Sequence, residues 1–89
     1  MKIQYDPDFL KTLKKLDAKI RKSFKKRIEI FLKDPFDPRL DNHELNREYQ
    51  GYRSIDINAD YRVIYEEIYK GAEPIAYFFQ IGTHEELYI

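Results

Sequence analysis

The sequence predicts a small α+β domain, in which a strand and two amphipathic helices precede a mainly antiparallel sheet of three or four strands. The apolar residues recur at helical spacing in the first third of the chain and at strand-like spacing in the second half. Short turns separate the later strands, and strands joined so tightly pair antiparallel. A chain of 89 residues is long enough for one domain and no more.

The amino-terminal third predicts a strand followed by a helical hairpin. An alternating apolar pattern indicates a short strand over residues 1–5. Asp6 and Pro7 are a favourable helix start, because Asp can cap free N–H groups and Pro loses no hydrogen bond at the first helical position. Asp17 can cap a second helix in the same way, and this helix is expected to end at Asp34.

The remaining residues predict the sheet. A polar connector covers residues 34–51, within which residues 43–45 are a candidate short strand. Residues 52–57 alternate, residues 61–68 are rich in β-branched and aromatic side chains, and residues 75–81 are almost continuously apolar, as in a strand buried on both faces. Two helices can cover one face of such a sheet, which gives a two-layer domain with polar strand residues on an open second face. The last residues are expected to form a turn or a single helical turn.

Composition and charge limit the classes of function. The chain has no Cys, which excludes disulfides and thiolate metal sites, and it has no apolar run long enough to span a bilayer. Because it also has no signal-peptide pattern, we expect a cytoplasmic protein with no membrane contact. The net charge is zero, yet residues 1–33 hold eleven of the 16 Lys and Arg, and residues 34–89 hold twelve of the 16 Asp and Glu. This asymmetry fits either a polyanionic or acidic partner for the basic half, or simply a solvated helix face.

Ionisable residues near the predicted strand ends are the candidates for chemistry. There is no Gly-rich phosphate loop or His-Glu-x-x-His motif, and the spacing of the two His and the carboxylates demands no metal. RNA cleavage without a metal needs a base, an acid and a cation for the crowded phosphate. His suits acid–base work near neutral pH, and Arg suits the phosphate because its planar fork donates paired hydrogen bonds. The candidates of these types are His84, Arg62, Asp60 and His43.

Each candidate also has a purely structural interpretation. A histidine at a strand–turn junction is more often a local hydrogen-bonding residue. Arg62 can be half of a surface ion pair with Glu44 or Glu66. Asp60 can satisfy the backbone of its turn, and His43 can order the connector. The residues alone therefore indicate a polar site on a small α+β domain, without deciding between these interpretations.

Three segments resemble the strand signatures of toxins of the RelE/ParE superfamily. They are Gly51-Tyr52-Arg53-Ser54-Ile55-Asp56-Ile57, Tyr61-Arg62-Val63-Ile64-Tyr65 and Ile81-Gly82-Thr83-His84-Glu85-Glu86-Leu87-Tyr88. The third segment is similar to the ending of the YafQ-like branch, and the resemblance extends over the whole chain. It implies a toxin of a type II toxin–antitoxin system with a cognate antitoxin protein as partner. It further implies ribosome-dependent, metal-independent cleavage of mRNA in the A site, with no small-molecule cofactor.

The resemblance also implies catalytic roles for four residues. His84 matches the carboxy-terminal histidine of YafQ-like toxins, which is the expected general acid. Asp60 and His43 match further residues of the site in that branch. Arg62 matches the arginine that RelE-like members use on the scissile phosphate.

Three further residues are implied to contact substrate. Arg53 stands where RelE-like members have a basic residue, and Tyr88 matches a terminal aromatic that supports substrate. Asp56 stands where the YafQ pattern has another histidine, so a carboxylate replaces one acid–base group. Two other functions fit the same fold: a ParE-type DNA gyrase inhibitor, against which His84 argues, and a weak toxin homologue that acts only by binding its antitoxin.

Overall fold

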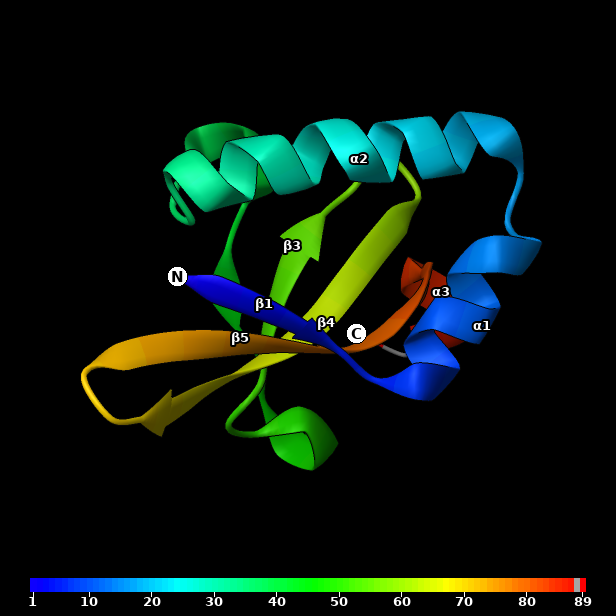
Figure 1. The fold of residues 1–89 in the computed structure, drawn as a ribbon. Coiled ribbons are helices and arrows are strands. Elements are labelled where there is room, and N and C mark those ends of the chain that lie inside the picture. The colour runs from blue at the N-terminus through cyan, green and yellow to red at the C-terminus, as the bar shows by residue number, and fades with distance from the viewer. Residues whose placement is uncertain (88) are drawn as a thin grey trace.

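The computed structural model describes residues 1–87 and 89, and it contains one sheet with helices on both sides (Figure 1). The strands lie in the order β1-β5-β4-β3-β2. The elements are β1 (Lys2–Tyr5), α1 (Pro7–Lys15), α2 (Ala18–Lys33), β2 (His43–Glu44), β3 (Arg53–Asp56), β4 (Tyr61–Lys70), β5 (Glu73–Thr83) and α3 (His84–Leu87), with short 3₁₀ helices at Pro38–Leu40 and Arg47–Tyr49. Among the described residues, no helix is both long and apolar enough to cross a membrane.

The two long helices start where the sequence predicts. The Asp6 side chain accepts a hydrogen bond from the backbone N–H of Asp8 at 2.8 Å, and Pro7 is the first helical residue of α1. The Asp17 side chain caps α2 through the backbone N–H of Lys19 at 2.7 Å. The predicted helical hairpin is therefore confirmed.

Aromatic residues fill the space between these helices and the sheet. Phe78, in the middle of β5, is completely buried and contacts the rings of Phe9 and Phe31 edge-on, with centroids 5.8 and 5.6 Å away. Tyr65 of β4 packs against the same two-helix layer through Phe31. This core fixes the position of β4 and β5, and the candidate site residues Asp60, Arg62 and His84 lie at or beside the ends of these strands.

The strand pairing confirms the α+β fold class, and it places the predicted first strand and the candidate short strand at the two edges of one sheet. β3, β4 and β5 pair antiparallel, as their short turns predict. β1 pairs parallel with β5, so that Lys2 lies opposite Ile75, and β2 pairs with β3 at the other edge. The sheet therefore has five strands, where three or four were expected. A parallel pair needs a long crossover, which the helical hairpin and the rest of the chain provide.

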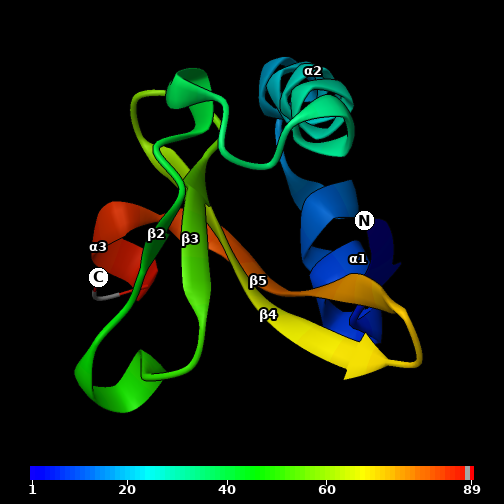
Figure 2. The same cartoon turned by 90° about the vertical axis from the view of Figure 1, so that its left-hand side faces the viewer.

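The second face of the sheet is partly covered, which differs from the open face that the sequence suggested. Leu45, Ile64 and Leu87 form a separate buried cluster there, against which Tyr52 and Phe79 are half-buried. Figure 2 shows α1 and α2 on one side of the sheet and α3 on the other. The sequence pattern missed this because the one-turn helix folds back over the strands through contacts that no local period reveals.

Candidate catalytic site on the second face of the sheet

The strand register brings three of the predicted residues onto the second face. Asp56 of β3 lies opposite Arg62 of β4, and Arg62 lies opposite Gly82 of β5. His43 of β2 lies opposite Ser54, two residues before Asp56 on β3. Directly opposite residues point to the same face, and so do residues two apart on a strand. His43, Asp56 and Arg62 therefore share the face that α1 and α2 leave free.

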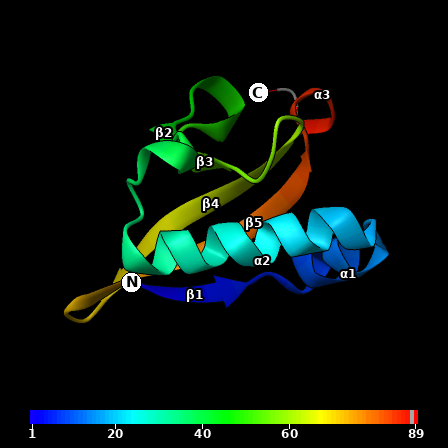
Figure 3. The ribbon, with the colours of Figure 1, turned by 90° about the horizontal axis from the view of Figure 1, so that it is seen from above.

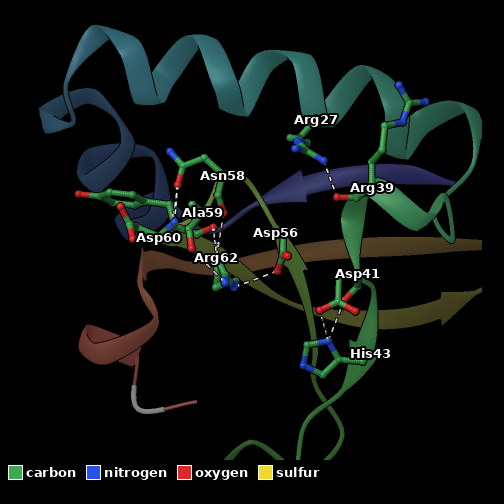
Figure 4. A network of polar contacts seen from close by, with 10 residues as sticks. Arg27, Arg39, Asp41, His43, Asp56, Asn58, Ala59, Asp60 and Arg62 are labelled. Atoms are coloured by element: carbon green, nitrogen blue, oxygen red, sulfur yellow. Dashed lines mark hydrogen bonds and ion pairs between the residues drawn. The ribbon is translucent and has the colours of Figure 1, made fainter.

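Arg62 is held by the turn that precedes it and by Asp56. Its Nη1 donates to the carbonyls of Asn58 at 2.9 Å and Tyr61 at 3.1 Å, and its Nη2 donates to the carbonyl of Ala59 at 3.3 Å. Its Nε lies 2.9 Å from Asp56 Oδ1 in an ion pair. Figure 4 shows the guanidinium between the turn and Asp56. The partner is thus neither Glu44 nor Glu66, and every nitrogen of the guanidinium is engaged.

Asp56 depends on this arginine for compensation of its charge. The carboxyl side chain is 25% exposed, and burial raises the pKa of Asp56 above its ordinary value, while the charge of Arg62 opposes that rise. Oδ1 is buried, and in the described part of the chain it has no partner besides the ion pair with Arg62 Nε. The sequence placed a carboxylate where the family pattern has a histidine, and in the structure this carboxylate is an ion-pair partner of Arg62.

The turn between β3 and β4 also holds the beginning of α3. The Asn58 side chain accepts hydrogen bonds from the backbone N–H groups of Asp60 and Tyr61, both at 2.8 Å. The Asp60 carbonyl in turn accepts a hydrogen bond from the backbone N–H of His84 at 3.1 Å. Both Asp60 and His84 are exposed, and they line a shallow cavity of about 350 Å³ together with Ala59, Tyr61, Thr83 and Glu85. The structure therefore brings these two predicted residues together.

A capping box places His84 at the first position of α3. The Thr83 hydroxyl accepts a hydrogen bond from the backbone N–H of Glu86 at 3.1 Å, and the Glu86 carboxylate accepts one from the backbone N–H of Thr83 at 2.8 Å. Leu87 then packs back over Gly82, where an added Cβ would meet Leu87 Cδ2 at 3.3 Å. The Thr-x-x-Glu spacing is a sequence signal for this helix start, and sequence reasoning used it only as part of a family signature.

His43 lies at the opposite edge of the same face. Its Nδ1 is 2.7 Å from the carbonyl oxygen of Asp41. A carbonyl can only accept, so Nδ1 carries the proton and, in the neutral ring, Nε2 keeps a lone pair. The side chain is 50% exposed. Asp41 adopts the left-handed conformation with φ of 47°, which turns the chain from the 3₁₀ helix into β2 and so presents His43.

Arg53 lies apart from this group, on the helix side of the sheet. It is opposite Tyr65 of the main core, its Nε donates to Asn42 Oδ1 at 2.8 Å, and its guanidinium stacks on Phe36 with 5.3 Å to the ring centroid. Sequence reasoning missed Asn42, whose amide nitrogen also donates to the Tyr65 hydroxyl at 2.7 Å. The predicted role of Tyr88 lies outside the described residues.

The whole chain matches one family of known proteins. A family model for YafQ, described as a bacterial toxin of a type II toxin–antitoxin system, matches residues 1–89. The chain belongs to the YafQ toxin family. It is thus a type II toxin, as the carboxy-terminal segment predicted. No curated protein sequence matches it significantly.

Solved structures share the fold of this YafQ-family toxin at low sequence identity. The YoeB/ParE toxin from Agrobacterium tumefaciens has a TM-score of 0.74 at 22% identity, over 94% of this chain and 99% of that one. YafQ from Escherichia coli has a TM-score of 0.72 at 22% identity, over 98% and 97%. The toxin–antitoxin complex RelBE2 from Mycobacterium tuberculosis has a TM-score of 0.72 at 17% identity, over 92% and 95%. The predicted RelE-like fold is confirmed.

Proposed function

We propose that this toxin is an endoribonuclease that cleaves mRNA on the ribosome. The observation that carries the proposal is the placement of His84. His84 is exposed at the first residue of a capped helix, lines one cavity with Asp60, and follows by two residues Gly82, which lies opposite Arg62. An accessible imidazole on an anchored backbone, lining the same cavity as a carboxyl side chain, suits proton transfer.

The geometry supports different roles for the two histidines, with His43 as the general base and His84 as the general acid. The 2′-hydroxyl of the substrate attacks the neighbouring phosphorus, and its proton passes to His43 Nε2, which the bond to Asp41 leaves with a free lone pair. The bond from phosphorus to the 5′ oxygen breaks, and His84 gives that oxygen a proton. The products are a 2′,3′-cyclic phosphate and a 5′-hydroxyl. Asp60 accepts a hydrogen bond from the ribose beside His84.

The substrate has to lie across the sheet for both histidines to reach it. β2 and β5 are separated by β3 and β4. Three interstrand spacings correspond to about 14 Å between the two backbones. The side chains of His43 and His84 therefore approach a bound nucleotide from opposite sides of the Asp56–Arg62 row. The phosphate binding expected of Arg62 has to compete with the ion pair to Asp56.

The positive charge of the helical hairpin supports binding of a polyanion near this site. Lys11, Lys14 and Lys15 are exposed on α1. α1 and α3 lie at the same end of the molecule (Figure 3) and together line a cavity that includes Thr12 and Leu87. Lys side chains that neutralise phosphates contribute affinity for RNA by releasing counterions.

We also propose that a cognate antitoxin neutralises the protein in the cytoplasm. Membership of a type II toxin family supports such a partner. In the solved DinJ–YafQ complex from E. coli, a toxin with a TM-score of 0.62 to this chain is bound to DinJ. Leu32, near the end of the basic helix α2, and Phe36, just after it, are large apolar side chains that are 52% and 58% exposed. Such a surface suits an apolar segment with acidic flanks.

Cleavage of a defined mRNA by the purified protein, with and without ribosomes programmed at the A site, tests the proposal. We expect ribosome-dependent cuts that His84→Ala slows by 100-fold or more, on the order of what a general acid contributes. Lys70→Ala, at the far hairpin turn, is the matched control and should cut like the wild type. If folded wild-type protein cuts no RNA but changes DNA supercoiling by gyrase, the ParE-type alternative replaces this one.

A further inference from the structure

We infer that Arg62 is a positioning residue for His84 and Asp60, and that it does not bind the scissile phosphate. The family resemblance alone would place this guanidinium on the substrate. In this chain its hydrogen bonds are directed to the backbone of the turn between β3 and β4, and its charge is directed to Asp56. The catalytic meaning of the inference rests on the proposed function, whereas its structural part does not.

A continuous chain of bonds leads from Arg62 to the proposed acid. Arg62 fixes the carbonyls of Asn58 and Ala59, and the next residue, Asp60, accepts the backbone N–H of His84 through its carbonyl. The peptide groups of the turn are thereby held by two sets of hydrogen bonds, from the Arg62 guanidinium and from the first backbone N–H of α3. A shift of the turn would move the Asp60 carboxylate and the start of α3 together.

The surroundings of Arg62 argue against a phosphate ligand. Its side chain is only 19% exposed, and each of its three nitrogens already has a partner. A phosphate would have to displace Asp56, whose buried Oδ1 would then lose its compensating charge. A planar guanidinium can satisfy three carbonyls and a carboxylate at once, which a single ammonium cannot do. The site therefore uses the shape of Arg62 as well as its charge.

Hydrogen exchange of the His84 amide measures this coupling directly. In the wild type we expect this amide to be protected by its bond to Asp60. Arg62→Lys, Arg62→Gln and Asp56→Asn should each speed its exchange at least several-fold, with Asp56→Asn the mildest because the carbonyl contacts remain. The Asp6 amide, bonded to Phe78 in the core, should keep its rate. Arg39→Gln removes another Arg–Asp ion pair, that of Arg39 with Asp37, whose arginine is more exposed, and should leave both amides unchanged.

Three exchange results would overturn the inference. Equal acceleration at Asp6 and His84 would mean that Arg62 only stabilises the fold. An unprotected His84 amide in the wild type would mean that the tether is absent in solution. Unchanged exchange in both Arg62 variants would mean that the turn holds without the guanidinium.

Salt-dependent binding of an uncleavable 2′-O-methyl RNA separates positioning from phosphate contact. For a single-stranded ligand, each lost phosphate contact lowers the slope of log K against log salt by about 0.7. We expect the same slope for Arg62→Gln and wild type, and a reduction of about 0.7 would overturn the inference. If cleavage is measurable, kcat should fall while KM stays within about twofold. Failure of the wild type to bind or cut RNA would count against the proposed function and leave the exchange result to decide the role of Arg62.

Discussion

At the scale of single residues, Gly82 and Thr83 each have a structural reason to precede His84 in the carboxy-terminal motif that resembles YafQ-like toxins. Gly82 leaves room for α3 to fold back onto β5, and its φ needs no left-handed conformation. Thr83 caps the helix that follows. His84 is therefore exposed at a defined point because its neighbours meet steric and capping requirements. The motif thus describes the support of this residue as well as the catalytic role that we propose for it.

Gly82→Ala should displace α3. We expect it to lower the cleavage rate strongly while the free energy of unfolding falls only slightly. The new Cβ would lie 3.3 Å from Leu87 Cδ2 and 3.4 Å from Glu86 Oε1, tighter than comfortable packing. Because the one-turn helix can move, we expect a loss of about 1 kcal/mol in the free energy of unfolding, at the low end for overpacking. Denaturant unfolding and cleavage assays measure the two effects.

Gly71→Ala is the control for this prediction. Gly71 has φ of +76° and open space around it, so alanine there should also lose about 1 kcal/mol, through backbone strain alone. Its cleavage rate should stay at the wild-type level. If the two alanine variants lose the same fraction of activity, the position of α3 is irrelevant to the reaction.

At the scale of elements, the sequence predicts those parts that depend on local signals. The caps at Asp6 and Asp17 and the helical stripes give α1 and α2 almost to the residue. The parallel pairing of β1 was missed because nothing near residues 2–5 encodes a partner over seventy residues away. Strand alternation already places Arg53 on the opposite face from Asp56, three residues later on the same strand. What the pattern could not show is that Arg53 contacts Asn42 and Phe36 on the helix side.

The candidate site divides in the same way. His84, Asp60 and His43 could be named from the motif, because chemistry depends on residue type. The support given by Asn58 and Asn42 could not, because these residues act through hydrogen bonds formed only in the folded chain. Arg62 illustrates the limit most clearly, since its partners, and hence its role, follow from the tertiary environment.

The short 3₁₀ helix at Pro38–Leu40 should make stability depend on pH in the acid range. Hydrogen bonds from Arg39 lower the pKa of Asp37 from 3.8 to about 2. The pKa is lower in the folded state than in the unfolded chain, so the ionised carboxylate stabilises the fold fully above about pH 4. This contribution is lost as the pH falls towards 2. Asp37→Asn keeps a capping side chain but removes the charge.

Thermal unfolding between pH 5 and pH 2 checks this expectation. The wild type should lose more stability on acidification than Asp37→Asn does. Arg39→Gln should behave like Asp37→Asn, because it removes the partner that lowers the pKa. Identical acid profiles for all three proteins would show that Asp37 titrates alike in the folded and unfolded states.

At the scale of the whole molecule, one amide ties the connector to the sheet. Asn42 donates to the carbonyl of Pro35 and to the hydroxyl of the fully buried Tyr65, and accepts from Arg53. The connector has little regular structure of its own, so these bonds decide how β2 and His43 sit against β3. Loss of the amide would therefore affect both stability and the site.

Asn42→Ala should lower the free energy of unfolding by about 2 kcal/mol, within the range for unsatisfied buried polar groups. For a domain of this size that corresponds to a fall in Tm of roughly 8 to 16 °C. Asn46→Ala is the control, because Asn46 is exposed and its side chain makes no capping bond, so its effect should stay within about 0.5 kcal/mol. Thermal unfolding followed by circular dichroism measures both Tm values. A Tm for Asn42→Ala within a few degrees of the wild type would rule out this bridging role.

The parallel pairing of β1 with β5 joins the first strand that is synthesised to the last. β5 lies between β1 and β4, so neither the helical layer nor the central pair can close before it exists. While residues 73–83 are still inside the ribosome, the nascent chain therefore has no complete core, and His84 is not yet held in position. The order of synthesis thus leaves the fold incomplete until β5 has emerged, which gives the producing cell an interval in which a partner can meet the chain as it folds.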